Sequence, residues 1–275
     1  MNAQKYYPNF LKRCVKIMKN KVFQIINSAG INDAAFCAFS KVKDHLLNCR
    51  ALQRIPQNSK TIIMCAFPYK VFEEKPQNIS RYAAVPDYHE VAGGYLSRAV
   101  EQLRSAFPQN SFEFFLDNSP IPEVFAAATA GLGVRGDNGL LITKKYGSWV
   151  FLGEILTDLE LECEEKYAEC LHCGACAAAC PKIKEQTDCL SAVSQKKREL
   201  EQKEIDALRN YGILWGCDIC SEVCPMNKGV KIAPLPEFAE HYRNCYTCGE
   251  DIAHRAYAWR GERVIKRNYE IVNSK

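Results

Sequence analysis

Hydrophobic and polar residues alternate at helical spacing through the first part of the chain. Between residues 10 and 26, apolar side chains recur every three or four positions among lysines and arginines, a pattern typical of amphipathic helices. We therefore expect two helices with a short element between them in residues 1–60. Residues 61–67 then form a β-branched and apolar run that ends at Pro68, which predicts a buried strand.

Predicted strands and helices alternate between about residues 60 and 160. Helices are expected at 93–107, where Leu96, Val100 and Leu103 share one face, and in the Ala-rich segment after Pro122. Further strands are expected at 112–116, 140–143 and 149–156. This alternation favours an α/β sheet domain, within a chain of mixed α+β and α/β class.

An acidic stretch at 158–165 marks the end of this pattern, and the cysteine-rich part of the chain follows it. A charged helix is expected near 194–209, within the cysteine-rich part. We predict an α/β catalytic domain at 1–160, a cysteine-rich domain at 161–235 and a short basic tail at 236–275.

The composition restricts the compartment and the partners. Fifteen cysteines in 275 residues are many for an intracellular chain, and an odd count argues against a disulfide framework. The net charge of +4 is small and does not indicate a nucleic-acid-binding tail. No apolar run reaches the roughly 18 residues that a membrane span needs, and no export segment opens the chain. We expect a soluble, cytoplasmic protein.

The spacing of the cysteines predicts iron–sulfur clusters. Cys170, Cys173, Cys176 and Cys180 follow the bacterial ferredoxin run, including the final proline, in which three cysteines bind one [4Fe–4S] cluster and the fourth binds another. Cys217, Cys220 and Cys224-Pro225 repeat the end of that pattern, and Cys189 supplies the remaining thiolate. We therefore predict a double-cluster, ferredoxin-like domain.

The same rule divides the eight ligands. One cluster is expected on Cys170, Cys173, Cys176 and Cys224, and the other on Cys180, Cys189, Cys217 and Cys220. Zinc is a weaker interpretation, because it favours two separated Cys-x2-Cys pairs. Whether the later pair Cys245 and Cys248 binds a metal with His241 and His254 stays open.

Several segments, in order, resemble the epoxyqueuosine reductase family, which is related in its core to reductive dehalogenases. The resemblance covers about residues 55–230. Its segments are 56–69, 87–89, 117–120, 130–133, 147–155 and 216–227, with a weaker match at 260–268. It implies a cobalamin-dependent oxidoreductase with two [4Fe–4S] clusters that converts epoxyqueuosine in tRNA to queuosine and takes electrons from an external low-potential donor.

The resemblance also assigns roles to single residues. Asp117 stands at the position of the family's proton donor, which makes it the expected catalytic residue and a cofactor contact. Ser80, Leu141 and Leu152 are expected near the cobalamin, and the glycines around 131–141 and 147–153 suit a close approach to its flat ring. From the residues alone, a turn aspartate is favoured over a catalytic one at Asp117, and strand core or turn explains the other three residues at least as well as a cobalamin contact.

Some features depart from the family. Arg135 and Asp137 replace an apolar residue and a lysine, which leaves the substrate open. Family members continue into a helical-repeat domain that contacts tRNA, so a tRNA footprint here would need basic residues of the core and tail, namely Arg255, Arg260, Arg263, Lys266 and Arg267. A paralogous corrinoid reductase with another substrate, a cobalamin-reactivating protein and a simple two-cluster electron carrier are alternatives. We expect a monomer that binds no membrane.

Overall fold

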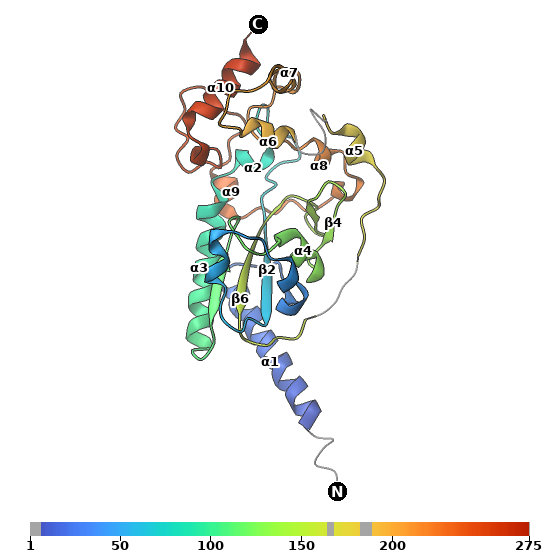
Figure 1. The fold of residues 1–275 in the computed structure, drawn as a ribbon, viewed down its shortest axis with the longest axis vertical. Helices are drawn as coiled ribbons and strands as arrows, with labels where there is room; N and C mark the ends of the chain where they lie inside the picture. Colours follow the sequence, from blue (N-terminus) through green and yellow to red (C-terminus); the bar gives the residue numbers. More distant parts are fainter. Residues whose placement is uncertain (1–6, 164–167, 182–188, 275) are drawn as a thin grey trace. The chain divides into compact units, whose positions relative to one another are not determined.

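The computed structural model describes residues 7–163, 168–181 and 189–274 and divides into two compact units (Figure 1). Unit 1 comprises Met1–Phe67, Ala92–Thr143 and Phe151–Cys170, and unit 2 comprises Pro68–Val91, Lys144–Val150 and Leu171–Lys275. This division differs from the predicted boundary near residue 160. Two segments from the middle of the chain pack with the cysteine-rich part, and sequence patterns cannot show such long-range packing.

Unit 1 is built on a four-stranded sheet in the order β1-β2-β6-β3 (Figure 1). The strands are β1 Ala34–Ala38, β2 Thr61–Pro68, β6 Val150–Thr157 and β3 Phe112–Phe115. All eight residues of β2 are buried, as its uninterrupted apolar run predicted. β3 runs antiparallel to β6 with Phe115 opposite Glu154, so the loop after β3 begins beside the middle of β6.

The helices of unit 1 agree only in part with the predictions. α3 Tyr88–Ala106 and α4 Glu123–Thr129 form where helices were predicted, and Leu96, Val100 and Leu103 are buried. The prediction of two helices in residues 1–60 is wrong. One helix, α1 Tyr7–Ser28, spans both apolar segments, because residues 19–21 contain nothing that breaks a helix. Strand β1 and three short 3-10 turns, Phe39–Lys41, Lys43–His45 and Arg50–Arg54, follow it.

The remaining strands of unit 1 form a separate hairpin. β4 Val134–Arg135 pairs antiparallel with β5 Leu141–Ile142 and lies outside the four-stranded sheet. The chain thus has the expected mixture of helix and sheet, but the predicted strand at 140–143 lies outside the main sheet, and β1, which was not predicted, belongs to it.

Unit 2 is mainly short helices around cysteine-bearing loops. Its helices are α2 Arg81–Ala84, α5 Ala175–Ala179, α6 Leu190–Ser194, α7 Gln202–Tyr211, α8 Ile219–Glu222, α9 Pro236–Glu240 and α10 Glu262–Asn273, with 3-10 turns at Pro225–Asn227 and Ala258–Arg260. The predicted charged helix at 194–209 corresponds to α7 from residue 202 onward, and residues 195–201 are not helical. None of the described helices combines the length and hydrophobicity needed to cross a bilayer.

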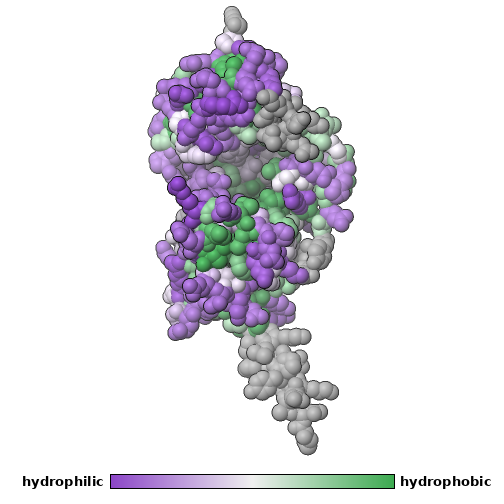
Figure 2. Space-filling model, viewed as in Figure 1, coloured by the Kyte–Doolittle hydropathy of each residue, from purple (hydrophilic) through white to green (hydrophobic). Residues whose placement is uncertain are grey.

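The C-terminal segment is part of the core of unit 2 and not a detached tail. Val264 and Ile265 of α10 are buried with Trp215 and Tyr257 in one apolar cluster. Asn268 is fully buried, and its side-chain nitrogen donates to Ser194 O and Leu214 O, both at 2.7 Å. The outer surface over α7 and α10 is mostly hydrophilic (Figure 2). α10 is thus an amphipathic helix whose apolar stripe closes this core.

Candidate active site

Asp117 lies at the tip of a tight turn that follows β3. Its φ is +61°, a left-handed conformation that few residues other than glycine adopt but that aspartate tolerates. The backbone nitrogen of Asn118 donates to Leu116 O, and that of Ser119 donates to Asp117 O, both at 2.8 Å. The turn therefore presents an acidic side chain directly at the end of a sheet strand, as the sequence predicted.

The Asp117 turn, residues 116–121, is anchored to a buried acid. Ser119 Oγ donates to Glu154 Oε1 on β6 and accepts a hydrogen bond from the backbone nitrogen of Ile121 at 3.0 Å. Glu154 is completely buried. Burial, and after it the carboxyl group of Glu123, raises the pKa of Glu154 well above its ordinary value, which favours the protonated form of Glu154.

The residues expected near cobalamin fall into both units. Leu141 of β5 and Leu152 of β6 belong to the same apolar core of unit 1. Ser80 lies in unit 2, precedes α2 and is 3% exposed. It lines a cleft of about 280 Å³, together with Cys217 and Asp218. The structure thus brings Leu141 and Leu152 together and places Ser80 beside a predicted cluster ligand.

Close packing within the protein accounts for the glycines that were expected to face a corrin ring. A Cβ at Gly133 would lie 2.6 Å from Ile142 O, and one at Gly153 would lie 2.8 Å from Leu96 Cδ1. A side chain at Gly147, which has φ +61°, would overlap Asn227. These glycines permit contacts between segments of the chain itself, so they give no independent support for a corrin site. Cobalamin remains an expectation from the family.

The cysteines of the second predicted cluster lie near one another in unit 2. Burial, and after it the neighbouring groups Cys189, Asp218 and Cys220, raise the pKa of the Cys217 thiol to about 12, against a lowering hydrogen bond from the backbone of Ile219. The arrangement brings together three of the four predicted ligands, including the sequence-distant Cys189. Thiolates are the usual ligands of iron–sulfur clusters, so this donor set fits such a cluster.

The other cysteine motif lies against the same region. α5 carries Cys176 and contacts α8, which carries Cys220. His172 and Gly174 both have positive φ, +48° and +73°, which lets the loop between Cys170 and Cys176 turn sharply. Among the described residues, no three of the eight predicted ligand thiols lie close enough together for one metal ion. A mononuclear zinc site on these thiols is therefore disfavoured, whereas a cubane holds its ligands farther apart at its corners.

The second possible metal set is not assembled. Within the described part of the chain, Cys245, Cys248, His241 and His254 contribute no group of three close ligand atoms. His254 Nδ1 lies 2.7 Å from Glu90 Oε2 instead.

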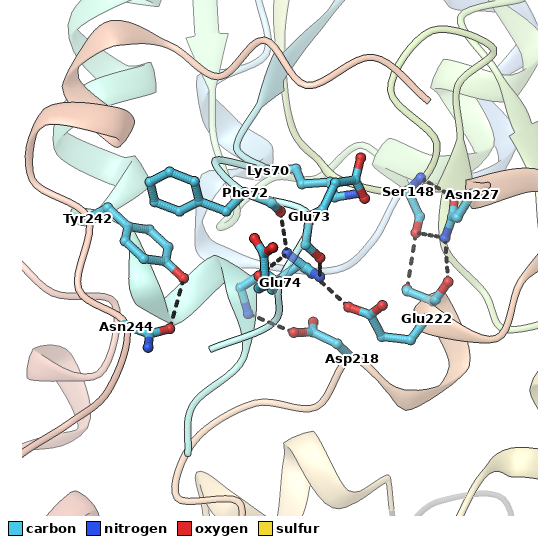
Figure 3. A network of polar contacts seen from close by, with 12 residues as sticks. Lys70, Phe72, Glu73, Glu74, Ser148, Asp218, Glu222, Asn227, Tyr242 and Asn244 are labelled. Carbon is cyan, nitrogen blue, oxygen red and sulfur yellow. Dashed lines mark hydrogen bonds and ion pairs between the residues drawn. The ribbon is translucent and has the colours of Figure 1, made fainter. Parts of the chain in front are cut away.

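Arg81 follows Ser80 of the cleft and contacts the segment that carries Cys217 and Cys220. It was not among the candidate site residues predicted from the sequence. The residue is 4% exposed. Its side chain donates to Phe72 O, Glu73 O, Glu74 O and Glu222 Oε1 at 2.7–3.0 Å (Figure 3). Its backbone nitrogen donates to Asp218 Oδ2 at 2.7 Å. Because Asp218 and Glu222 flank Cys220, Arg81 holds the segment that carries the predicted ligands.

A second polar network ties the loop before β6 to the same segment (Figure 3). The backbone nitrogen of Ser148 donates to Asn227 Oδ1 at 2.9 Å, and Asn227 Nδ2 donates to Ser221 O at 2.8 Å. One buried polar residue could have been recognised from the sequence, since Glu154 is a charged residue inside the apolar run 150–157. Arg81 gave no comparable signal, because its partners lie up to 141 positions away.

Comparison with known proteins places the chain in a family. Residues 50–118 match the family model described as epoxyqueuosine reductase QueG, DUF1730. The epoxyqueuosine reductase of Lactococcus garvieae is 31% identical over 253 residues, covering 77% of this chain and 68% of the relative. That of Gloeobacter violaceus is 35% identical over 190 residues, covering 65% of this chain and 60% of the relative.

Solved structures show the same fold. The epoxyqueuosine reductase of Streptococcus thermophilus superimposes with a TM-score of 0.74 at 24% identity, covering 92% of this chain and 80% of that chain. An epoxyqueuosine reductase solved with an epoxyqueuosine-modified tRNA stem loop superimposes with a TM-score of 0.76 at 22% identity, covering 93% and 80%. The chain spans 60%, 68% and 54% of the length of three curated relatives. It belongs to the epoxyqueuosine reductase family.

Proposed function

We propose that this protein is an oxidoreductase that converts epoxyqueuosine in tRNA to queuosine. The observation that carries the proposal is Asp117, which a left-handed turn presents at the end of β3 in a chain of this family. In the solved Bacillus subtilis epoxyqueuosine reductase, a loop with a catalytic aspartate is swung out of the active site. The Asp117 turn is the corresponding loop in our proposal.

The reaction sets the task of Asp117. Conversion of an epoxide to an alkene breaks both carbon–oxygen bonds, takes up two electrons and two protons, and releases the oxygen as water. An alkoxide leaves poorly unless it is protonated, and a positioned acid contributes roughly 10²–10⁴-fold to such a step. Asp117 donates a proton to the departing oxygen.

The remaining residues hold the cofactors. Cys170, Cys173, Cys176 and Cys224 hold one [4Fe–4S] cluster, and Cys180, Cys189, Cys217 and Cys220 hold the other. Ser80, Leu141, Leu152 and Asp117 contact cobalamin. When bound, the clusters supply electrons singly, and cobalamin supplies the reduced metal that engages the epoxide. The electrons come from an external low-potential donor, and the protein acts as a monomer.

The tRNA partner is proposed from the family and from the complex solved with a stem loop. Two of the basic residues considered for RNA contact have other roles. Arg255 is buried and donates to His241 O at 2.8 Å, and Arg267 donates to Lys196 O at 2.8 Å. Arg263 donates to Lys197 O at 3.4 Å and Lys266 pairs with Glu262 at 2.7 Å on the surface, and these two with Arg260 are the residues proposed for phosphate contacts.

Complementation tests the function. The protein is expressed in a strain lacking epoxyqueuosine reductase, and its tRNA is analysed for both nucleosides. We expect the wild type to convert epoxyqueuosine and Asp117→Asn to fail while keeping its iron and cobalamin content. The matched control is Asp44→Asn, an exposed aspartate of unit 1, which should retain activity. Full activity of Asp117→Asn would remove Asp117 from the mechanism, and an inactive, fully loaded wild type would refute the function.

A second measurement separates the proposal from a simple electron carrier. Anaerobic reduction of the clusters in the presence of added cobalamin should reduce the cobalt below its +2 state. Cobalamin that stays at +2 beside reduced clusters would leave only the electron-carrier alternative.

A further inference from the structure

A pair of carboxyl groups lies beneath the Asp117 turn. Glu154 stands in the middle of the main sheet, and Glu123 opens α4. The two carboxyl groups are neighbours, because Glu123 raises the pKa of Glu154 beyond the effect of burial. Two carboxyl groups so close cannot both be ionised at low cost in a buried place, so the pair retains one proton.

The hydrogen-bond directions locate that proton. Ser119 Oγ donates to Glu154 Oε1, which makes this oxygen an acceptor. A protonated carboxyl group has one donor oxygen and one acceptor oxygen. Any proton on Glu154 is therefore carried by its second oxygen, Oε2.

The groups facing Glu154 come from three elements. Glu123 is on α4, Ser119 is in the Asp117 turn, and Cys65 on β2 is a buried thiol whose pKa Glu154 helps to raise after burial itself. Ser119 is the direct link to the turn, because its hydroxyl also accepts the backbone nitrogen of Ile121. The turn is held at its far end as well, where Pro120 O accepts the backbone nitrogen of Leu47 at 2.8 Å.

We infer that Glu154, held by Glu123, is a positioning residue that fixes the Asp117 turn through Ser119. Glu154 is paired with Phe115, the last paired residue of β3, two positions before Asp117, and it reaches the turn through Ser119. The effect on catalysis rests on the proposed function, whereas the effect on the turn does not. Without Glu154, the Ser119 hydroxyl loses its acceptor and the left-handed turn loses its anchor on β6.

Hydrogen–deuterium exchange tests the anchor directly on the holoprotein. The measured amides are those of Asn118, Ser119 and Ile121, all hydrogen-bonded within the turn. Glu154→Ala and Ser119→Ala should speed their exchange about tenfold, since each substitution leaves a buried polar group without its partner. Glu154→Gln should stay within about twofold of the wild type, because its amide oxygen still accepts from Ser119.

Thr157→Val is the matched control, because Thr157 is a buried polar residue of the same strand whose hydroxyl bonds Leu159 and not the turn. It should leave exchange in the turn unchanged. Amide exchange in the turn of Ser119→Ala that is as slow as in the wild type would overturn the inference, even if Glu154→Ala does not fold. Exchange in Glu154→Gln as fast as in Glu154→Ala would overturn it too, because packing would then explain the effect.

Single-turnover conversion of epoxyqueuosine in tRNA adds the catalytic readout. Ser119→Ala should lower the rate constant about tenfold with an unchanged KM for tRNA, and Glu154→Gln should keep most of the rate. A changed KM with an unchanged rate constant would contradict positioning of Asp117. A wild type that does not convert the substrate refutes the proposed function alone, since the exchange measurements still decide the role of Glu154.

Discussion

Substitution of Arg81 should cause a large loss in the free energy of unfolding of unit 2. Its guanidinium is 4% exposed, donates to three backbone carbonyls and to Glu222, and lies 5.0 Å from the centre of the Trp149 ring. Arg81→Met keeps much of the aliphatic volume but removes every one of these donors. Lysine cannot replace it, because a single ammonium group does not match four acceptors spread over a planar fork.

The size of this loss of stability follows from the burial of the Arg81 guanidinium. Hydrogen bonds from a charged donor contribute about 1.5–3 kcal/mol each, but the desolvation of the guanidinium offsets much of that sum. Breaking a buried ion pair by removing one partner costs about 3–5 kcal/mol, and we expect Arg81→Met to destabilise unit 2 by that amount. Arg243 is the matched control in the same unit. It donates to Asp251 O and pairs with Glu250 at 3.5 Å, with 37% of its side chain exposed, so Arg243→Met should cost about 1 kcal/mol or less.

Anaerobic urea unfolding measures both variants. Trp149, Trp215 and Trp259, which are all three tryptophans of the chain, lie in unit 2, so their fluorescence reports the unfolding of that unit alone. Iron content gives a second readout, because Arg81 holds the segment around Cys220. Equal losses of stability in Arg81→Met and Arg243→Met would refute the reasoning, since Arg81 is more buried and has more hydrogen-bond acceptors than Arg243.

Three further predictions concern the folded state. Gly216→Ala should lower the free energy of unfolding by at least about 2 kcal/mol, because Gly216 has φ +74° and a Cβ would lie 2.6 Å from Ser80 Cβ. Gly212 has φ +62° but open space around it, so Gly212→Ala should lower it by only about 1 kcal/mol. Urea unfolding compares the two variants. Burial opposes ionisation of Glu204, but hydrogen bonds from Arg198 and Lys196 lower its pKa to about 2. Its stabilisation is therefore present above the unfolded pKa of about 4.5 and lost as the pH falls toward 2, and Glu204→Gln should flatten this acid limb in fluorescence-monitored unfolding. The pKa of Glu154 is raised by burial and by Glu123, so the folded state binds more protons than the unfolded state above about pH 4.5. Stability of unit 1 should fall with rising pH by up to about 1.4 kcal/mol per pH unit, and circular dichroism should show this slope reduced in Glu154→Gln.

Local patterns predicted many elements because their causes are local. The apolar run 61–67 became the fully buried strand β2, and the helical spacing of Leu96, Val100 and Leu103 placed them on the buried face of α3. The same reasoning divided α1 into two helices, because short apolar clusters separated by lysines look alike whether or not the helix continues through them. The domain boundary failed for another reason, since residues 68–91 and 144–150 pack with partners far along the chain.

The sequence by itself determined the cysteine motifs, most strands and helices and the place of Asp117 after β3, since spacing and periodicity act within a few residues. Only the tertiary structure decided that Ser119 meets Glu154, that Arg81 meets Glu222, and that α10 closes the core of unit 2. Each of these contacts joins residues 35 or more positions apart. Their free energy comes from burying apolar surface and from hydrogen bonds that offset the cost of burying polar groups, and no spacing along the chain records which residues meet there.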